Sequence, residues 1–365
     1  MLLSLAEYGK LYNKSNDTVR RLAEQGILQT AKKIGRNWVV DSCEKYPVKA
    51  RNRKKTICRR WKIISLFSGC GGLDLGFLGG FDFLGNHYAR NPFDIIWANE
   101  ISPAACKTYK LNLGNHIINS DISEAIQSLP EHADVIIGGF PCQDISINGK
   151  MLGIKGKRSS LYTYMVDSVK RVSPKIFVAE NVGGLLLKQN EYSLNKILDD
   201  FSSLGYKVTH KLYNASDYGV PQTRERVFIV GVKEGLPLFY PPEPTCKSPV
   251  TAKDAIADLE NMEEDKSFSH IWSMANVSGE QGNRRLIEER PGYTIRAECH
   301  GNIQFHYSLP RRISMREAAR IQSFPDSFIF PCGLRETERQ IGNAVPPVMA
   351  WNIAQAAQKV LLVKK

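Results

Sequence analysis

The chain has 365 residues, of which 42% are hydrophobic and 24% are charged. This length predicts about two or three domains with a buried core, and the composition excludes a disordered chain. No run approaches the roughly 20 apolar residues of a membrane helix, and the N-terminal residues lack the features of a secretory signal. We therefore expect a cytoplasmic protein without a membrane partner.

The formal net charge of +12 is unevenly distributed along the chain. Residues 1–62 hold 16 Lys and Arg against 5 Asp and Glu, whereas residues 63–365 carry 33 against 32. Within the first part, residues 49–62 include eight basic residues and no acid. Such a run either stays solvated as a linker or lies on nucleic-acid phosphates.

The eight cysteines are scattered along the chain and contain no C-x-x-C pair. Neither a zinc site nor a disulfide framework is therefore indicated, and we expect no bound metal. Most of these thiols should be small buried side chains.

Residues 1–47 are predicted to form a small module. Ser4 and Glu7 have the spacing of a capping box at the start of a first helix. A second helix follows and ends at Gly26, and a turn at Gly35 then separates two short strands.

This pattern resembles the winged helix-turn-helix of excisionase and MerR proteins. The resemblance implies that the second helix enters the major groove of DNA, with Thr18, Arg20 and Arg21 facing the duplex. The alternative is a helical cap that only packs on the rest of the chain.

From residue 63 onward, short apolar runs alternate with segments of helix length. The five clearest runs are residues 63–67, 95–100, 135–139, 176–181 and 226–231. This order predicts an α/β domain with a parallel, doubly wound sheet, whose ligand sites lie at the carboxyl ends of the strands.

A glycine-rich turn at residues 68–72 follows the first run, and Glu100 ends the second. Such a turn lets the backbone approach a ligand closely, and an acid in the second position binds ribose hydroxyls. The pair favours a nucleoside cofactor such as NAD, FAD or S-adenosylmethionine, although a turn of this kind can also simply pack.

Cys142 comes directly after the third run, on a loop stiffened by Pro141. A cysteine there is either a structural thiol or a nucleophile. Glu180 ends another strand, so the sheet can bring its carboxylate to the same crevice. A thiol, a proton-donating carboxylate and a cofactor turn together suit addition to an electron-poor ring followed by group transfer.

Six ordered motifs between residues 63 and 360 resemble those of the DNA (cytosine-5) methyltransferases. They are FSGCGG at 67–72, PCQ at 141–143, ENV at 180–182, QTRER at 222–226, REAARIQSFP at 316–325 and QIGNAVPP at 340–347. The resemblance implies a Rossmann-like methyltransferase sheet, S-adenosylmethionine as methyl donor with S-adenosylhomocysteine as product, and double-stranded DNA as substrate.

The resemblance also implies a role for each motif residue. Cys142 would attack C6 of a flipped-out cytosine while Glu180 protonates N3. Asn181 would hold the Glu180 loop, and Arg226 would support Glu180. The cofactor site would comprise Phe67, Gly69, Gly71, Gly72, Glu100, Ile101, Asp121, Ile122, Pro141, Leu161, Asn343 and Val345. Ile101 stands where many relatives have an aromatic ring, and Asp121 can equally be a helix cap.

The DNA contacts that the resemblance implies lie in three places. Arg158 and Arg224 would face the duplex, and residues 143–157 are expected to form a mobile lid over the base. Residues 233–310 match the family least, as a target-recognition region should. The candidate base contacts there are Asn283, Arg284 and Arg285.

The predicted domain order follows from these assignments. It comprises a DNA-binding module at 1–47, a basic linker at 48–62, a catalytic domain at 63–232, a recognition region at 233–310 and a segment at 311–365 whose last helix returns to the catalytic domain. We expect a nucleoid-associated monomer that serves as the modification partner of a separately acting restriction endonuclease. Two alternatives stay open, a tRNA cytosine-5 methyltransferase and a transcriptional regulator that acts through residues 1–62.

Overall fold

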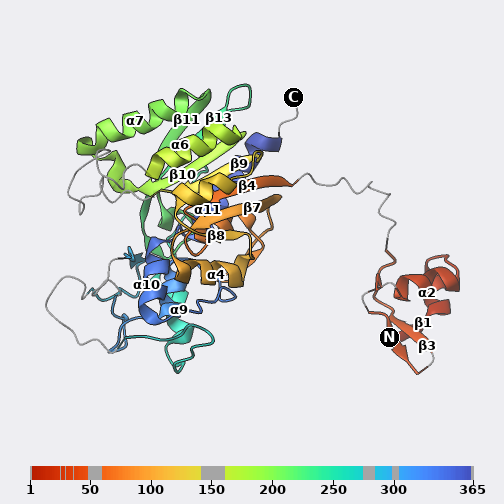
Figure 1. Cartoon of the computed structure of the whole chain (residues 1–365). Helices are drawn as coiled ribbons and strands as arrows, with labels where there is room; N and C mark the ends of the chain where they lie inside the picture. The colour runs from red at the N-terminus through yellow and green to blue at the C-terminus, as the bar shows by residue number, and fades with distance from the viewer. Residues whose placement is uncertain are drawn as a thin grey trace. The chain divides into compact units, whose positions relative to one another are not determined.

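A computed structural model describes residues 2–24, 26–28, 30–35, 37–47, 60–140, 161–273, 284–297 and 304–362. The chain divides into two compact units, residues 1–59 and 60–365 (Figure 1). None of the helices within the described residues is long and apolar enough to cross a membrane.

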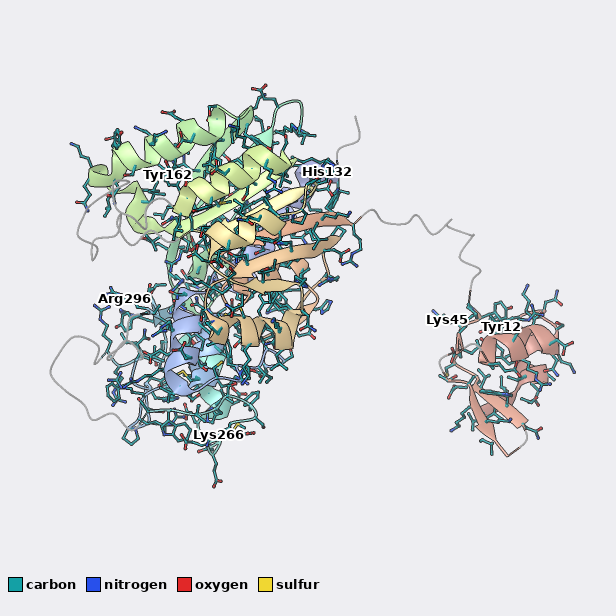
Figure 2. All side chains as sticks on the ribbon, in the orientation of Figure 1. Tyr12, Lys45, His132, Tyr162, Lys266 and Arg296 are labelled. Carbon is teal, nitrogen blue, oxygen red and sulfur yellow. The ribbon has the colours of Figure 1, made fainter. Side chains whose placement is uncertain are left out.

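The N-terminal unit is a helix pair on a small antiparallel sheet. Its elements are β1 (Leu2–Ser4), α1 (Leu5–Leu11), α2 (Asn16–Glu24), β2 (Lys32–Ile34) and β3 (Asn37–Asp41), and the strand order is β1-β3-β2. The predicted capping box is confirmed, because the Ser4 hydroxyl accepts from the Glu7 amide and the Glu7 carboxylate accepts from the Ser4 amide. Figure 2 labels Tyr12 and Lys45 in this unit.

This unit has a core of its own. The buried residues are Leu5, Tyr8, Val19, Ala23, Leu28 and Val40, drawn from both helices and the sheet. Gly26 adopts a φ of +66° just after α2, as the sequence predicted for the residue that ends the helix.

The second unit, residues 60–365, is built on a seven-stranded sheet with the order β11-β13-β10-β9-β4-β7-β8. The strands are β4 (Trp61–Leu66), β7 (Phe93–Glu100), β8 (Ile117–Asn119), β9 (Val135–Gly139), β10 (Ile176–Val182), β11 (Tyr206–Asn214) and β13 (Glu225–Lys233). All neighbouring pairs from β10 to β8 are parallel, whereas β13 runs antiparallel to both β10 and β11.

The prediction of an all-parallel sheet is therefore wrong at this edge. The apolar run at 226–231 does form a strand, but periodicity does not report strand direction. β11 was not predicted, because its sequence YKVTHKLYN mixes polar and apolar residues as an edge strand does, rather than forming the continuous apolar run of a central strand.

Successive residues on the central strands face two separate hydrophobic cores. Ile63 packs with α3 (Gly72–Leu78), α4 (Pro103–Leu113) and α11 (Pro347–Leu362). Ile64 packs with α5 (Ile122–Ala125), α6 (Leu161–Val172) and α7 (Glu191–Ser202) on the other face (Figure 1). Burial of both faces explains why these strands read as unbroken apolar runs.

The helix predicted to return to the catalytic domain does so. α11 packs against α3, where an added Cβ on Gly76 would come within 2.3 Å of the Ala350 Cβ. Ile353, Ala354 and Val360 of this helix are buried, whereas Trp351 is half-buried.

The remaining elements lie in smaller sheets and helices. They are β5 (Phe81–Phe83), β6 (Asn86–Tyr88), β12 (Gln222–Thr223), α8 (Ala252–Ile256), β14 (Gly292–Tyr293), α9 (Met315–Ile321) and α10 (Leu334–Asn343). β12, which leads into β13, pairs with β14 in the expected recognition region. The recognition region is thus attached directly to the strand that carries Arg226.

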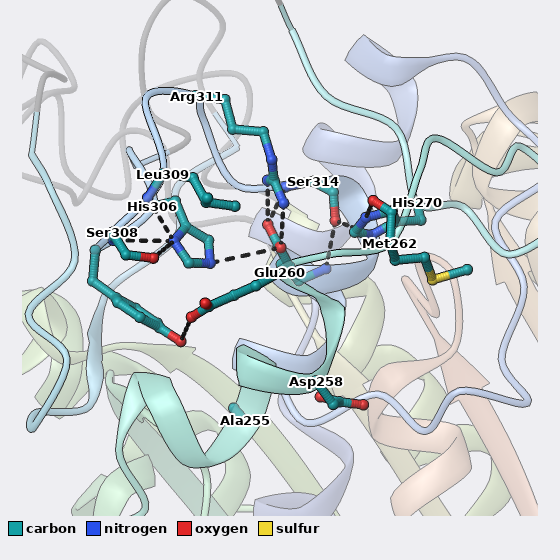
Figure 3. Close-up of polar contacts among 12 residues, drawn as sticks. Ala255, Asp258, Glu260, Met262, His270, His306, Ser308, Leu309, Arg311 and Ser314 are labelled. Carbon is teal, nitrogen blue, oxygen red and sulfur yellow. Dashed lines mark hydrogen bonds and ion pairs between the residues drawn. The ribbon is translucent and has the colours of Figure 1, made fainter.

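A buried polar network holds the segment between the recognition region and α9 (Figure 3). Glu317 is fully buried and accepts two hydrogen bonds from Arg311, both at 2.8 Å, and one from the Ser314 amide at 2.7 Å. The Ser314 hydroxyl bonds His270 Nδ1, and Nδ1 of His306 accepts from backbone amides of the following turn. These bonds satisfy charged groups that burial would otherwise destabilise.

Candidate active site

The catalytic candidates meet at the carboxyl ends of two adjacent strands. β9 and β10 are parallel, with Gly139 opposite Glu180. Asn181 Nδ2 donates to the Phe140 carbonyl at 3.3 Å, and its Oδ1 accepts from the Val182 amide at 2.8 Å. Asn181 thus ties the end of β10 to the residue that precedes Pro141.

Several of the expected site residues lie outside the described part of the chain. They are Pro141, Cys142, Arg158, Asn283 and the lid at 143–157. The described chain on either side ends at Phe140, whose carbonyl Asn181 holds, and resumes at Leu161, where α6 begins. The strand end that leads into Cys142 is therefore fixed beside Glu180.

Glu180 and Arg226 form a buried ion pair. The Arg226 Nε lies 2.8 Å from a Glu180 carboxylate oxygen, and the two side chains are 12% and 11% exposed. Burial raises the pKa of Glu180, although the neighbouring Arg226 charge opposes the shift. A carboxyl group in this setting can hold a proton nearer to neutral pH and deliver it to a ligand.

Gly139 allows this carboxylate to sit against the neighbouring strand. A Cβ at residue 139 would lie 2.8 Å from Glu180 Oε2, so any larger residue would displace the acid. The backbone at the end of β9 thus determines where the Glu180 carboxylate at the end of β10 can lie.

A hollow of about 340 Å³ lies beside Arg226. Its lining residues are Gly183, Gly184, Asn214, Thr223, Glu225, Arg226 and Thr294. Thr294 belongs to the expected recognition region, as does Arg296, which Figure 2 labels. Sequence reasoning missed Asn214 and Thr294, because they reach this hollow only through strand pairing: β11 places Asn214 opposite Glu225 of β13, and the pairing of β12 with β14 brings Thr294 to Thr223.

The glycine-rich turn after β4 has an unusual backbone. Phe67, Gly69 and Gly71 have φ values of +55°, +56° and +97°, and a positive φ at a bulky residue such as Phe67 is strained. A Cβ on Gly71 would come within 2.3 Å of the Leu113 side chain, so the turn requires glycine there.

Glu100 lies directly against this turn. Its two carboxylate oxygens accept from the amides of Gly69 at 3.0 Å and Ser102 at 2.8 Å. Beside it, Ile101 is 63% exposed, which is unusual for a large aliphatic side chain next to a buried strand. A Cβ on Gly69 would meet only open space. The turn, Glu100 and Ile101 therefore lie beside a space that a ligand can occupy.

Residues 343–345, far along the chain, lie against the same turn. We call the glycine-rich turn, Glu100, Ile101 and residues 343–345 the cradle. Gly72 packs so closely on residues 344–345 that a Cβ there would lie 2.4 Å from the Val345 carbonyl. Asn343 is exposed at the end of α10, immediately before this contact. The motif at 340–347 is therefore brought onto the glycine-rich turn.

Two residues of the expected cofactor site, Asp121 and Ile122, have different surroundings. Asp121 caps α5 by accepting from the Ser123 amide at 2.9 Å, so the helix-cap role is present. Ile122 is 3% exposed and packs in the core on the α6 side, which leaves mainly its backbone for a ligand.

One of the arginines expected at DNA, Arg224, holds the protein together instead, whereas the DNA contact of the exposed Arg285 stays a prediction. Arg224 is fully buried and donates to the carbonyls of Ile295, Gly342 and Ala344 at 2.7–3.1 Å, so the expectation that it faces DNA is wrong. The guanidinium of Arg285 donates to the carbonyls of His306 and Leu309 at 2.6 and 3.1 Å.

The other expected DNA contacts that the structure describes are accessible. Arg284 is exposed, with its guanidinium 5.4 Å from the centre of the Tyr293 ring. In the N-terminal unit, Thr18, Arg20 and Arg21 are all exposed on α2, and Arg20 forms an ion pair with Glu24 at 3.0 Å.

Comparison with known proteins gives a consistent result for the catalytic unit. Residues 61–279 and 267–359 match the family model described as C-5 cytosine-specific DNA methylase. Type II methyltransferase M.NgoFVII of Neisseria gonorrhoeae is 39% identical over 81% of this chain and 86% of its own length. Type II methyltransferase M.FnuDI of Fusobacterium nucleatum is 35% identical over 83% and 96%.

Solved structures share the fold. A prophage-encoded Escherichia coli protein assigned as a DNA modification methyltransferase superposes with a TM-score of 0.64, 27% identity and coverage of 82% of this chain and 99% of that one. The S. pombe Dnmt2 methyltransferase superposes with a TM-score of 0.60 over 83% and 100%, and at 18% identity it supports the fold alone.

Proposed function

The chain belongs to the C-5 cytosine-specific DNA methylase family and is a DNA (cytosine-5) methyltransferase, and we propose that it methylates cytosine through a covalent Cys142 adduct. The observation that carries this mechanism is the buried Glu180–Arg226 pair beside the strand end that leads into Cys142. We further propose that it protects a short duplex sequence alongside a separately acting restriction endonuclease, since its relatives are named type II methyltransferases.

The proposed chemistry gives each group a role. The Cys142 thiolate forms a bond to C6 of a flipped-out cytosine while Glu180 delivers a proton to N3, so that C5 becomes nucleophilic. C5 takes the methyl group that the cofactor would supply, as the methyl–sulfur bond of the donor breaks. C5 then loses its own proton to a base, the bond to the Cys142 sulfur breaks, and N3 returns its proton to the Glu180 carboxylate. Arg226 keeps the Glu180 carboxyl oriented throughout.

S-Adenosylmethionine is the cofactor that this family requires, and the residues of the cradle fit it. Glu100 has carboxylate lone pairs for ribose hydroxyls, the exposed Ile101 offers an apolar face for adenine, and Gly69 opens onto free space. The cofactor supplies the methyl group when bound. We assign Asn343 and the backbone near Val345 to the same cradle, because Gly72 packs on that segment.

Tritium transfer from labelled S-adenosylmethionine to duplex DNA tests the mechanism. We expect Cys142→Ala to abolish transfer, and the matched variant Cys43→Ala, which alters an exposed thiol of the N-terminal unit, to retain it. Activity remaining in Cys142→Ala would contradict the covalent route. Bisulfite sequencing of a host that expresses the protein would identify the methylated motif.

A second activity is favoured by the N-terminal unit. The exposed face of α2 carries Thr18, Arg20 and Arg21, and the neighbouring strand β2 exposes Lys32 and Lys33. We propose that this unit is a winged helix-turn-helix that binds duplex DNA and adds affinity or represses transcription, beside methylation rather than in place of it.

Gel-shift assays on the full chain at several salt concentrations test this second activity. We expect Arg21→Ala combined with Lys33→Ala to weaken duplex binding and to flatten its salt dependence, because fewer phosphate contacts release fewer counterions. Methyl transfer at saturating DNA should be unchanged. An unaltered salt dependence would show that the unit does not contact phosphate.

A further inference from the structure

One buried acid of the catalytic unit is used neither by the proposed chemistry nor by the family assignments. Asp74, in the first turn of α3, is fully buried. Its Oδ1 accepts from the Tyr109 hydroxyl at 2.8 Å, and its Oδ2 accepts from the Ser65 hydroxyl at 3.1 Å. The two side chains that bond this carboxylate are thus neutral hydroxyls.

These bonds connect Asp74 to the glycine-rich turn by two routes. The Ser65 hydroxyl accepts from Ser68 at 2.8 Å, and Ser68 directly precedes Gly69. On the other side, the Tyr109 ring lies 3.0 Å from the position of a Cβ on Gly71. The carboxylate therefore supports both ends of the turn on which we place the methionine part of the cofactor.

Burial sets the electrostatic character of this support. It raises the pKa of Asp74 to about 6 against the two hydroxyl hydrogen bonds, so the group is ionised in neutral solution. A charge enclosed by protein is screened by solvent and salt far less than a surface charge is.

We propose that Asp74 positions the glycine-rich turn and supplies a negative charge that favours the sulfonium cofactor over its product. S-Adenosylmethionine and S-adenosylhomocysteine differ by a methyl group and by one positive charge. A fixed anion beneath the turn stabilises the charged form alone and so assists exchange of product for fresh cofactor. This inference rests on the proposed use of S-adenosylmethionine at this turn.

A simpler role would be structural, because an acid in the first turn of a helix is stabilising in itself. The two roles make different predictions for ligand binding. Loss of a structural support weakens both ligands alike, whereas loss of the charge weakens only the cationic one.

Isothermal titration calorimetry on the full-length apo protein distinguishes these roles. In Asp74→Asn we expect the Kd of S-adenosylmethionine to rise about fivefold or more, and that of S-adenosylhomocysteine to change less than about twofold. Sinefungin, which carries an amine in place of the sulfonium, should follow the cofactor. Asp82→Asn, at an exposed acid of β5, is the matched control and should alter neither ligand.

Tyr109→Phe removes the hydrogen bonds of the hydroxyl to Asp74 and His116 but keeps the charge, so it should weaken both ligands by a similar factor. If Asp74→Asn does not fold, the wild-type protein provides the measurement. Its preference for S-adenosylmethionine over S-adenosylhomocysteine should fall between pH 8 and pH 5. The titratable groups that face Asp74 or the turn are Glu100, Cys70, Tyr109 and His116. Burial raises the pKa of the first three and lowers that of His116.

An unchanged preference in Asp74→Asn, or one that does not vary with pH in the wild type, would overturn the inference. A wild-type protein that binds neither ligand would instead contradict the proposed cofactor. The two failures are therefore distinguishable.

Discussion

At the carboxyl end of β10, Glu180 bonds Arg226, whose side chain borders an open hollow, whereas in the recognition region Arg285 bonds backbone carbonyls. The first arrangement leaves a protonatable oxygen near a site where a ligand can enter. The second uses one guanidinium nitrogen of an exposed arginine to join two parts of the backbone. An arginine can thus support an acid or tie backbone segments together, and burial together with the bonded partner distinguishes the two arrangements.

The largest expected effect comes from Glu180, at the carboxyl end of β10. Glu180→Gln keeps the shape of the pair but cannot deliver a proton, so methyl transfer should fall by about 10²- to 10⁴-fold. Because burial raises the pKa of Glu180, wild-type transfer should also decline as pH rises through that raised value. Tritium transfer under single-turnover conditions measures both effects.

The matched control is Glu225→Gln, on β13 beside Arg226. Glu225 is exposed and lines the hollow, but its carboxylate does not bond Arg226. It should retain most of the activity. Equal losses in the two variants would mean that the ion pair has no special role.

The next effect sharpens the contrast between the two kinds of arginine. Arg224→Met removes the donor to the buried carbonyls of Ile295 and Gly342 and one of the two donors to that of Ala344, so the free energy of unfolding should fall by about 3 kcal/mol. Arg285→Met, at an exposed residue, should cost about 1 kcal/mol, because water can replace its donors. Urea unfolding gives both values, and equal losses would show that burial is not what separates these arginines.

The smallest effect concerns the network of Figure 3. Burial lowers the pKa of His306, despite the nearby Glu317 carboxylate, and its Nδ1 already accepts from two backbone amides. Protonation must break those bonds, so stability should be lost as pH falls below the unfolded histidine pKa of about 6.5. His306→Asn, which keeps an acceptor oxygen, should lose about 1 kcal/mol less between pH 7 and pH 5.

Thermal or urea unfolding at the two pH values measures this difference. His132→Asn, at an exposed histidine of the same unit, is the control and should follow the wild type. A steeper acid loss in His306→Asn than in the wild type would contradict the assignment of Nδ1 as an acceptor.

The cofactor turn could be predicted from sequence because its chemistry is local. Glycines at 69, 71 and 72 and an acid ending the next strand are needed wherever this turn closes on a ligand, and the structure brings Gly69 and Glu100 into contact. Strand order at the other edge could not be predicted in the same way. The antiparallel pairing of β13 depends on contacts with β10 and β11 that leave no signature in its apolar run.

The role of Arg224 was beyond sequence reasoning for a related reason. Its partners, Ile295, Gly342 and Ala344, lie far away along the chain, so the residue type alone could not distinguish a DNA contact from a structural tie. Asp74 was missed similarly, because its burial depends on Tyr109 from another helix.

The packing of Gly72 and Gly76 under residues 345–350 also bears on how the enzyme is made in the cell. The ribosome completes the glycine-rich turn early, but the helix that closes over it is translated only after the whole recognition region. A nascent chain should therefore be unable to hold its cofactor until α11 has been translated. Premature termination anywhere upstream of α11 would yield inert protein rather than a partly active methylase.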